Sequence, residues 1–237
     1  MFTHVGENKK IFKAIHRSAH AQRNYDLDRD MPQEDLDLIV EAATQCPSKQ
    51  NISFYKAHFI TNRDLIEKIH AETEGFYARN GVWSDKSESK GNVTNSQVLG
   101  NLLIVFEANN PFVNGRMADS PTKRALQRKM ELVSGAVRPV HDESKVEWTV
   151  ERDQHMAVGV AAGYVNMTAS MMGYGTGCCA CFRVEEVKEL LGIDGEPLLM
   201  MGIGFKQKGV NRRVHHTERN FKFPTFIKQK INTFFWK

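Results

Sequence analysis

The stretch QHMAVGVAAGYVNMTASMM, residues 154–172, is apolar or small around nearly its whole circumference when it is wound at helical spacing. Glycines follow at positions 173 and 175, as is common just past a helix end. A helix without a polar face is buried, so the stretch predicts a long core helix. Its small residues, such as Gly159 and Gly163, would also let a second backbone approach closely. Two interpretations stay open: a core helix alone, or a core helix that also packs on a second copy.

Helical and strand patterns intermix on either side of this stretch. Short apolar runs typical of central strands occupy 102–108 (LLIVFEA) and 198–205 (LLMMGIGF), and alternation over 55–61 (YKAHFIT) indicates a third strand. We expect these three strands to share one sheet. Further helices are predicted before Ser18 and over 32–46, 64–72 and 184–191.

Composition places the chain among globular proteins. Its 237 residues are 41% hydrophobic and 25% charged, and no Pro/Gly/Ser-rich linker divides them, so we expect a single domain over residues 1–237. The excess of basic over acidic residues is only +4, which is too small to favour nucleic acid as a partner.

Neither the start of the sequence nor its apolar runs indicate an export signal or a membrane span. The start, MFTHVGENKK, has no apolar core of a signal peptide, and no apolar run reaches the roughly 18 residues that span a bilayer. We therefore expect a cytoplasmic protein without a membrane partner.

Three of the four cysteines, Cys178, Cys179 and Cys181, crowd one segment. Their C-C-x-C spacing differs from the C-x-x-C pair of structural zinc sites, and no second pair follows, so no metal site is predicted. No neighbouring base in the sequence would activate a thiol. We interpret these residues as small buried side chains that line a loop.

Two further segments differ from the rest of the chain. Residues 109–150 are polar and irregular, and long loops of this kind in compact domains are often lids. Residues 217–237 carry six aromatic side chains among several lysines, and so dense an aromatic extension should pack on its own domain or on a partner subunit.

Basic residues cluster near both ends, around Arg17 and around Arg213. The planar fork of arginine is suited to binding phosphate, and a dianion is often held by two distant segments of a chain. Each cluster alone is also compatible with a solvated surface. CPSKQN, residues 46–51, closes the predicted helix over 32–46. It could bind the edge of a heterocycle, or simply end the helix.

Several motifs occur in a specific order. RSAHAQRNY (17–25) is followed by CPSKQN, then by Asn92 and Asn95 before NLLIVFEA. The apolar helix ends in GYGTG (173–177), and ACFRVEEVKELLGI (180–193), LLMMGIGF and a trailing Arg212 or Arg213 complete the series. Taken together, this order resembles the nitroreductase family of flavin mononucleotide (FMN) enzymes over about residues 11–213.

The resemblance implies a fold and an activity. The fold would be α+β in three layers, with a central, mainly antiparallel sheet flanked by helices and a long buried helix at the interface of a homodimer. The activity would be that of an oxidoreductase that takes hydride from NADH or NADPH onto flavin N5. Electrons would then pass to a small organic acceptor, such as a nitroaromatic compound or a quinone, in a ping-pong cycle. Because the chemistry is centred on the flavin, no side chain is expected to act as a catalytic acid or base.

The resemblance also implies which residues hold FMN at the subunit interface. Arg17 and Arg213, or Arg212, would hold the phosphate, and Arg23 would lie near the pyrimidine edge and stabilise the negative charge that reduction adds. The full set of cofactor-binding residues that it implies is Arg17, Ser18, His20, Arg23, Pro47, Ser48, Asn51, Asn92, Asn95, Ala180, Cys181, Arg212 and Arg213. Ser48 and Asn51 would come from the other subunit.

The sequence departs from the family pattern in three places. The first basic element is about two residues longer, so the roles of Arg17, His20 and Arg23 could be permuted. Ile52-Ser53-Phe54-Tyr55 replaces the usual x-Q-P-W, and Asn95 aligns with a second lysine of many members. The alternatives are therefore a relative with dehalogenating or flavin-fragmenting chemistry, a flavin carrier or regulator without turnover, and a binder of anionic surfaces.

Overall fold

The computed structural model describes residues 5–74, 77–79, 82–84, 94–113, 116–117, 143–207, 228 and 231–236. Its helices are α1 (Val5–Ser18), α2 (Gln33–Thr44), η1 (Lys49–Asn51), α3 (Arg63–Ala71), η2 (Ser96–Val98), α5 (Glu143–Met172) and α6 (Val184–Leu191), of which η1 and η2 are short 3-10 turns. Its strands are β1 (Tyr55–Ile60), β2 (Tyr77–Arg79), β3 (Val82–Ser84), β4 (Leu102–Ala108), β5 (Phe112–Val113), β6 (Arg116–Met117), β7 (Gly175–Cys179) and β8 (Pro197–Gly204).

One antiparallel sheet in the order β1-β4-β8-β7 forms the middle layer. Its inner strand β4 is the apolar run LLIVFEA, and residues Leu102 to Phe106 are fully buried. Ile104 pairs with Phe59 of β1 on one side and with Met201 of β8 on the other. The prediction that the three apolar runs share one sheet is confirmed.

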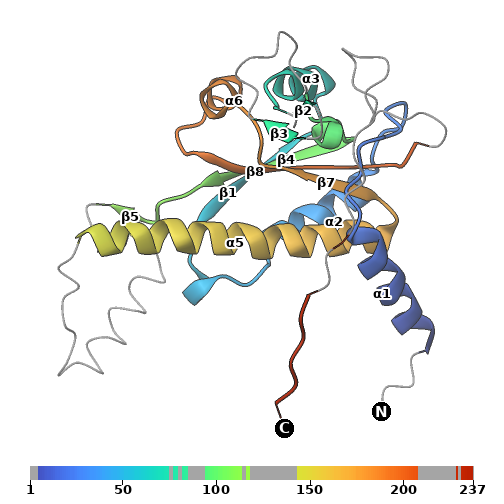
Figure 1. The fold of residues 1–237 in the computed structure, drawn as a ribbon, viewed down its shortest axis with the longest axis horizontal. Helices are drawn as coiled ribbons and strands as arrows, with labels where there is room; N and C mark the ends of the chain where they lie inside the picture. The colour runs from blue at the N-terminus through green and yellow to red at the C-terminus, as the bar shows by residue number, and fades with distance from the viewer. Residues whose placement is uncertain are drawn as a thin grey trace.

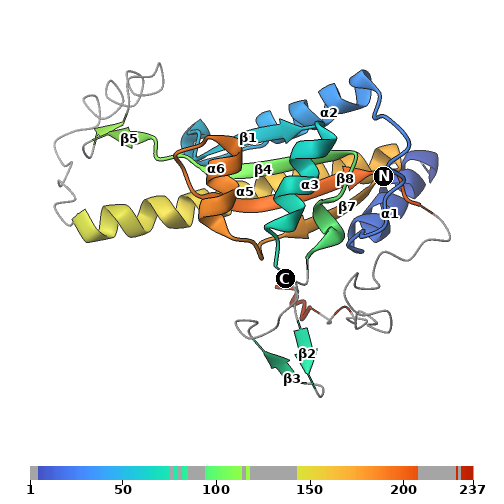
Figure 2. The ribbon, with the colours of Figure 1, turned by 90° about the horizontal axis from the view of Figure 1, so that it is seen from above.

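Helices cover both faces of this sheet (Figures 1 and 2). On one face, Ile104 and Phe106 pack with Ile39 of α2 and Val165 of α5. On the other face, residues of β4 such as Leu103 pack with α3 and α6. The result is the α+β arrangement of three layers that the sequence predicted.

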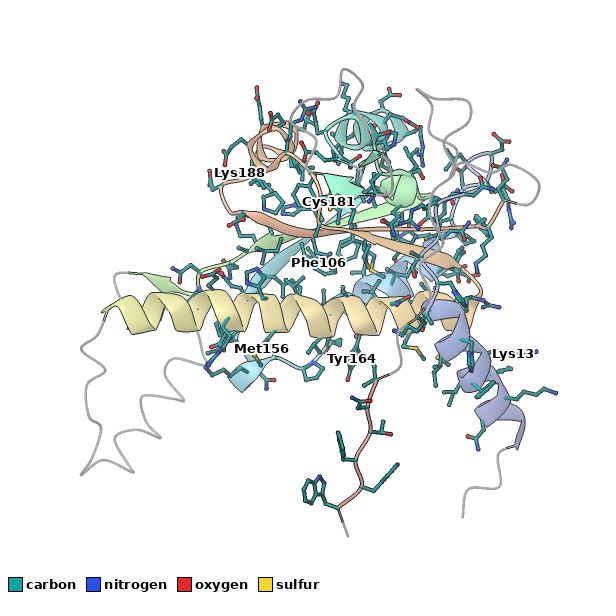
Figure 3. The ribbon with its side chains drawn as sticks, in the orientation of Figure 1. Lys13, Phe106, Met156, Tyr164, Cys181 and Lys188 are labelled. Atoms are coloured by element: carbon teal, nitrogen blue, oxygen red, sulfur yellow. The ribbon has the colours of Figure 1, made fainter. Side chains whose placement is uncertain are left out.

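α5 is the longest helix and runs the length of the sheet (Figure 1). Ala161 and Val165 face the core and are fully buried. On the opposite side, Met156, Val160 and Tyr164 are 58%, 40% and 48% exposed, and the labelled Met156 and Tyr164 project away from the sheet in Figure 3. The prediction of a helix buried all round is thus wrong for the single chain, because the sheet, α1 and α2 cover one side of α5 only.

Two predicted boundaries also differ from the structure. α5 begins at Glu143, eleven residues before the predicted start, so the end of the 109–150 segment is helical. GTGCC, interpreted as a loop, is the edge strand β7, which pairs with β8 from Gly175 to Cys179. The close approach of the Gln22 segment explains the glycine at position 177 of β7. A Cβ there would lie 2.5 Å from the carbonyl oxygen of Gln22.

The described part of the aromatic extension does not pack on its own chain. Ile231, Phe234, Phe235 and Trp236 are 72–93% exposed. Of the two expectations for this extension, packing on a partner subunit stays a prediction. Among the described helices, none combines the length and the hydropathy that a membrane crossing requires.

Candidate functional site

The C-terminal end of α1 rests on the last turns of α5. The Arg17 guanidinium donates a hydrogen bond to the carbonyl oxygen of Ser170, and the Asn166 side chain donates to the Ser18 carbonyl oxygen over 3.2 Å. The Ser18 hydroxyl donates to the carbonyl oxygen of Ile15 over 2.8 Å, and His20 is exposed. Arg17 is therefore held beside the helix end rather than free in solvent.

A second cation, Lys206, approaches Arg17 from the residues after β8. Lys206 pairs with Tyr25 in an isolated bridge, and its Cε lies 3.1 Å from the place that a Cβ on Gly175 would take. Arg17 Nη1 lies 3.8 Å from the corresponding place at Gly173. Partial burial and the nearby charge of Arg17 lower the pKa of Lys206. Neither cation forms an ion pair with a carboxylate in the described part of the chain.

The chain after α1 then follows the edge of the sheet. Gln22 donates its backbone N–H to the carbonyl oxygen of Thr176 over 2.6 Å, which aligns the segment with β7. Arg23 is half-buried next to Tyr25, which is fully buried. Burial raises the pKa of Tyr25, and the positive charge of Arg23 opposes that rise. Arg23 thus lies at the same edge as Arg17.

Asn95 lies at the end of β7 that leads to Ala180 and Cys181. Its backbone N–H donates to the hydroxyl of Thr73 over 2.6 Å, and its side-chain oxygen accepts the Gln97 N–H over 3.1 Å. The Cys181 carbonyl oxygen accepts the Glu74 N–H over 2.7 Å. Hydrogen bonds therefore hold Asn95 and the residues after β7 in one arrangement.

The prediction of small buried cysteines holds for Cys179 but is wrong for Cys178, which is exposed on the edge strand β7. Cys179 is buried, and burial raises the pKa of its thiol to about 11 even though Asn95 hydrogen-bonds to it. Such a thiol stays protonated near neutral pH. Within the described residues, no three His, Cys, Asp or Glu side chains gather as metal ligands.

Pro47, Ser48 and Asn51 form a second group at the junction of α2, η1 and β1. The Ser48 hydroxyl donates to the carbonyl oxygen of Ile52 over 2.8 Å, and Asn51 adopts a left-handed backbone with φ of +54°. These residues border a cleft of about 630 Å³. Its lining combines the end of α2, the η1 loop and the edge strand β1, including Cys46, Pro47, Ser48, Asn51, Ile52, Tyr55, Ala57 and Phe59.

The two groups contact α5 at widely separated points along its length. Lys49, between Ser48 and Asn51, pairs with Asp153 of α5 over 2.5 Å, whereas Arg17 bonds to Ser170. These contact points are seventeen residues apart on one helix, or about 25 Å at 1.5 Å per residue. The structure thus brings together Arg17, Ser18, Arg23 and Asn95 at one edge, but not Ser48 and Asn51.

Some residues of the predicted set lie outside the described part of the chain, namely Asn92, Arg212 and Arg213. Sequence reasoning also missed Lys206, because the search for a trailing cation began six residues later. The available signal was its place directly after the strand LLMMGIGF. Tyr25 belonged to the first motif but was given no role, and Gln22 and Gln97 were missed, because nothing in the sequence shows that their segments meet.

A comparison with family models identifies the family of the chain. The model described as the nitroreductase family matches residues 16–205, which is most of the chain. The chain belongs to the nitroreductase family. A search of curated proteins finds no match for this nitroreductase-family chain.

Solved structures similar to this nitroreductase-family chain share its fold at low sequence identity. The ydfN protein of Bacillus subtilis, named as a nitroreductase, is 16% identical with a TM-score of 0.55, over 91% of this chain and 98% of that one. The NfrA1 nitroreductase of the same species is 15% identical with a TM-score of 0.55, over 89% and 75%. A Staphylococcus epidermidis protein named as an NAD(P)H:FMN oxidoreductase is 16% identical with a TM-score of 0.54, over 90% and 95%.

Proposed function

We propose that this protein is an FMN-dependent oxidoreductase that takes hydride from NADH or NADPH and reduces a small organic acceptor, such as a nitroaromatic compound or a quinone. When bound, FMN would supply the hydride-accepting N5 position and would pass electrons to the acceptor in a ping-pong cycle. The chain's own residues would bind and orient the reactants and exclude water. This assignment rests on the family and on the residues that follow.

The convergence of Arg17 and Lys206 carries the proposal. Two nearby cations repel each other, and an anion bound between them would offset that repulsion. A phosphate monoester carries close to two negative charges at neutral pH, and the planar fork of arginine suits its oxygens. The donor set beside Gly173 and Gly175 therefore fits the phosphate of FMN. We assign Lys206 to this phosphate site together with Arg17.

Arg23 and Asn95 would contact the pyrimidine edge of the flavin. Both lie beyond Arg17 along the β7 edge, on segments that hydrogen bonds tie to the sheet. A cation near the pyrimidine stabilises the negative charge that reduction adds, so Arg23 would favour the reduced form. Ala180 and Cys181 would offer backbone N–H groups. No proton-transferring side chain is needed in this account.

A second copy of the chain would complete the site with its Ser48 and Asn51. The midpoint between Asp153 and Ser170 on α5 falls between Ala161 and Ala162. A two-fold axis at that midpoint would bring the Ser48 end of one chain over the Arg17 end of the other. We infer a homodimer in which each FMN contacts both chains.

The exposed side of α5 supports this dimer. Val160 and Tyr164 flank the midpoint and are 40% and 48% exposed. A Cβ added at Gly159 or Gly163 would meet nothing within 4 Å, so the single chain leaves room for a neighbouring backbone there. Burial of this apolar surface would favour association. We also place the protein in the cytoplasm, where its four free cysteines would stay reduced.

An absorption spectrum of the purified protein tests the proposal. We expect a flavin spectrum, FMN as the released chromophore, and bleaching when NADH or NADPH is added without oxygen. Bound FMN that stays oxidised with both donors would replace the reductase with a carrier or a different flavin reaction. Protein that is colourless and takes up no added FMN would contradict the cofactor assignment.

A further inference from the structure

The hydroxyl of Tyr25 lies at a junction of three chain segments. Its oxygen is 3.1 Å from the carbonyl oxygen of Gln97, 3.1 Å from that of Gly202 and 3.3 Å from that of Gln22. The side chain is completely buried. A phenol has one O–H to donate, so three carbonyl oxygens share a single buried donor.

Two glycines allow the segments to meet so closely. A Cβ on Gly202 would lie 2.1 Å from the Gln97 carbonyl oxygen, and a Cβ on Gly177 would lie 3.0 Å from the Tyr25 oxygen. Neither site can accept a side chain without moving the backbone. The junction is therefore closed around the hydroxyl, and its geometry depends on that one group.

Each of two segments at the junction carries a residue of the proposed pyrimidine site. Gln22 directly precedes Arg23. Gln97 is tied to Asn95 twice, through its backbone N–H over 3.1 Å and through a side-chain contact of 2.9 Å. The Tyr25 hydroxyl is thus the shared point between the Arg23 segment and the Asn95 turn.

We propose that Tyr25 is a positioning residue whose hydroxyl sets the placement of Arg23 relative to Asn95, and thereby the preference of the site for reduced over oxidised FMN. The inference rests on the proposed function. Charge interactions depend on distance, and reduction adds negative charge to the pyrimidine, so a displaced Arg23 weakens the reduced complex more than the oxidised one.

Tyr25→Phe tests the inference, because it removes the hydroxyl and keeps the ring. Tyr174→Phe is the matched control: Tyr174 is 3% exposed, and its hydroxyl donates to the partly buried carboxylate of Asp35 on α2 rather than to the Arg23 segment or the Asn95 turn. For wild type and both variants, the dissociation constant of oxidised FMN is measured by fluorescence titration. The equilibrium of the FMN-bound protein with a redox dye then gives the ratio of the dissociation constants of oxidised and reduced FMN. Thermal unfolding measures the stability of each protein.

We expect both variants to lose stability, but only Tyr25→Phe to change the ratio, by about tenfold toward oxidised FMN, as the loss of one well-placed polar interaction would. A ratio in Tyr25→Phe that moves no more than in Tyr174→Phe overturns the inference, even if wild type binds and bleaches FMN. If Tyr25→Phe does not fold, Gly177→Ala, whose Cβ would push the Gln22 carbonyl and the Tyr25 hydroxyl apart, must shift the ratio in the same direction. A wild type that binds no FMN overturns the proposed function first, and the inference with it.

Discussion

The ammonium of Lys49 lies 2.5 Å from the carboxylate of Asp153, whose side chain is only 4% exposed. This pair ties the η1 loop, with Ser48 and Asn51, to the N-terminal half of α5. Arg152 lies 3.5 Å from the other carboxylate oxygen, so the buried acid faces two cations. The position of the loop on α5 decides where a second copy can present Ser48 and Asn51.

Asp153→Asn removes the charge and keeps the shape, so it should free the loop without opening a cavity. We expect a loss of stability of about 1–2 kcal/mol, since half-exposed Lys49 stays solvated, together with an FMN affinity reduced several-fold. Thermal unfolding and fluorescence titration measure the two effects. Glu151→Gln, an exposed change on the same helix, should alter neither. Unchanged FMN affinity in Asp153→Asn would remove the loop from the site.

Lys206→Met tests the phosphate site. It removes a charge from an exposed position and should lower FMN affinity by about tenfold or more, because charge-assisted bonds to phosphate are strong. The dependence of FMN affinity on salt should become flatter as well. Lys13→Met, exposed on α1, is the control and should change neither quantity. Equal FMN affinities in Lys206→Met and Lys13→Met would exclude Lys206 from the phosphate site.

The same lysine predicts how binding depends on pH. Burial and Arg17 lower the pKa of Lys206 below its ordinary value of 10.5, so the side chain loses its charge at a lower pH than a free lysine. FMN affinity of wild type should therefore weaken as the pH rises toward 10.5. Titrations across that range should show a smaller weakening in Lys206→Met than in wild type, because other groups titrate alike in both proteins. Equal losses in the two proteins would contradict the assignment.

Glu107 on β4 makes the stability of the sheet sensitive to acid. It is 1% exposed. Burial pushes its pKa upward, but bonds from Lys56 (2.8 Å), His58 (2.7 Å) and the Gly195 N–H (2.9 Å) outweigh burial and lower the pKa below 4.5. A lowered pKa in the folded state contributes stability above about pH 4.5, and that stability is lost as the pH falls through the folded value.

Glu107→Gln should accordingly cost about 1–3 kcal/mol at pH 7, because the amide keeps one oxygen acceptor but loses the negative charge that Lys56 and His58 face. The difference from wild type should shrink in acid. Urea unfolding at several pH values measures both effects. Glu67→Gln removes a half-exposed i,i+4 partner of Arg63 and should cost under about 0.5 kcal/mol. A difference between wild type and Glu107→Gln that is constant with pH would refute the linkage.

Val160→Asp tests the dimer. The side chain is 40% exposed in the single chain, so an aspartate there should leave the protomer folded but should separate the copies and release FMN. Sedimentation and the flavin spectrum report the two effects. Leu38→Asp, at a 53% exposed position on α2, is the control. A Val160→Asp protein that remains dimeric would show that α5 is not the interface.

The sequence predicted those elements whose own residues are apolar enough to indicate burial. β4 matched its predicted range of 102–108 because a strand buried on both faces must be continuously apolar. β7 was missed because GTGCC has a single β-branched residue. Its pairing with β8 depends on the tertiary structure, which the local sequence does not show. The start of α5 was missed because its first turns are polar. For the site, the resemblance to the family implied Arg17 and Ser48, whereas their residue types alone did not distinguish them from a solvated surface and a helix end. Only the fold shows that Lys206 lies near Arg17 and that Ser48 lies far from both.

Mixing two defective variants tests most directly whether two chains build one FMN site. Lys206→Met removes a phosphate contact, and Asn51→Gly removes the amide at the other end while glycine tolerates the left-handed backbone. If each site takes Lys206 from one chain and Asn51 from the other, randomly mixed dimers recover wild-type FMN affinity in about a quarter of their sites. If FMN titration of the mixture shows only the two weakened affinities, each site lies within one chain and the shared site is wrong.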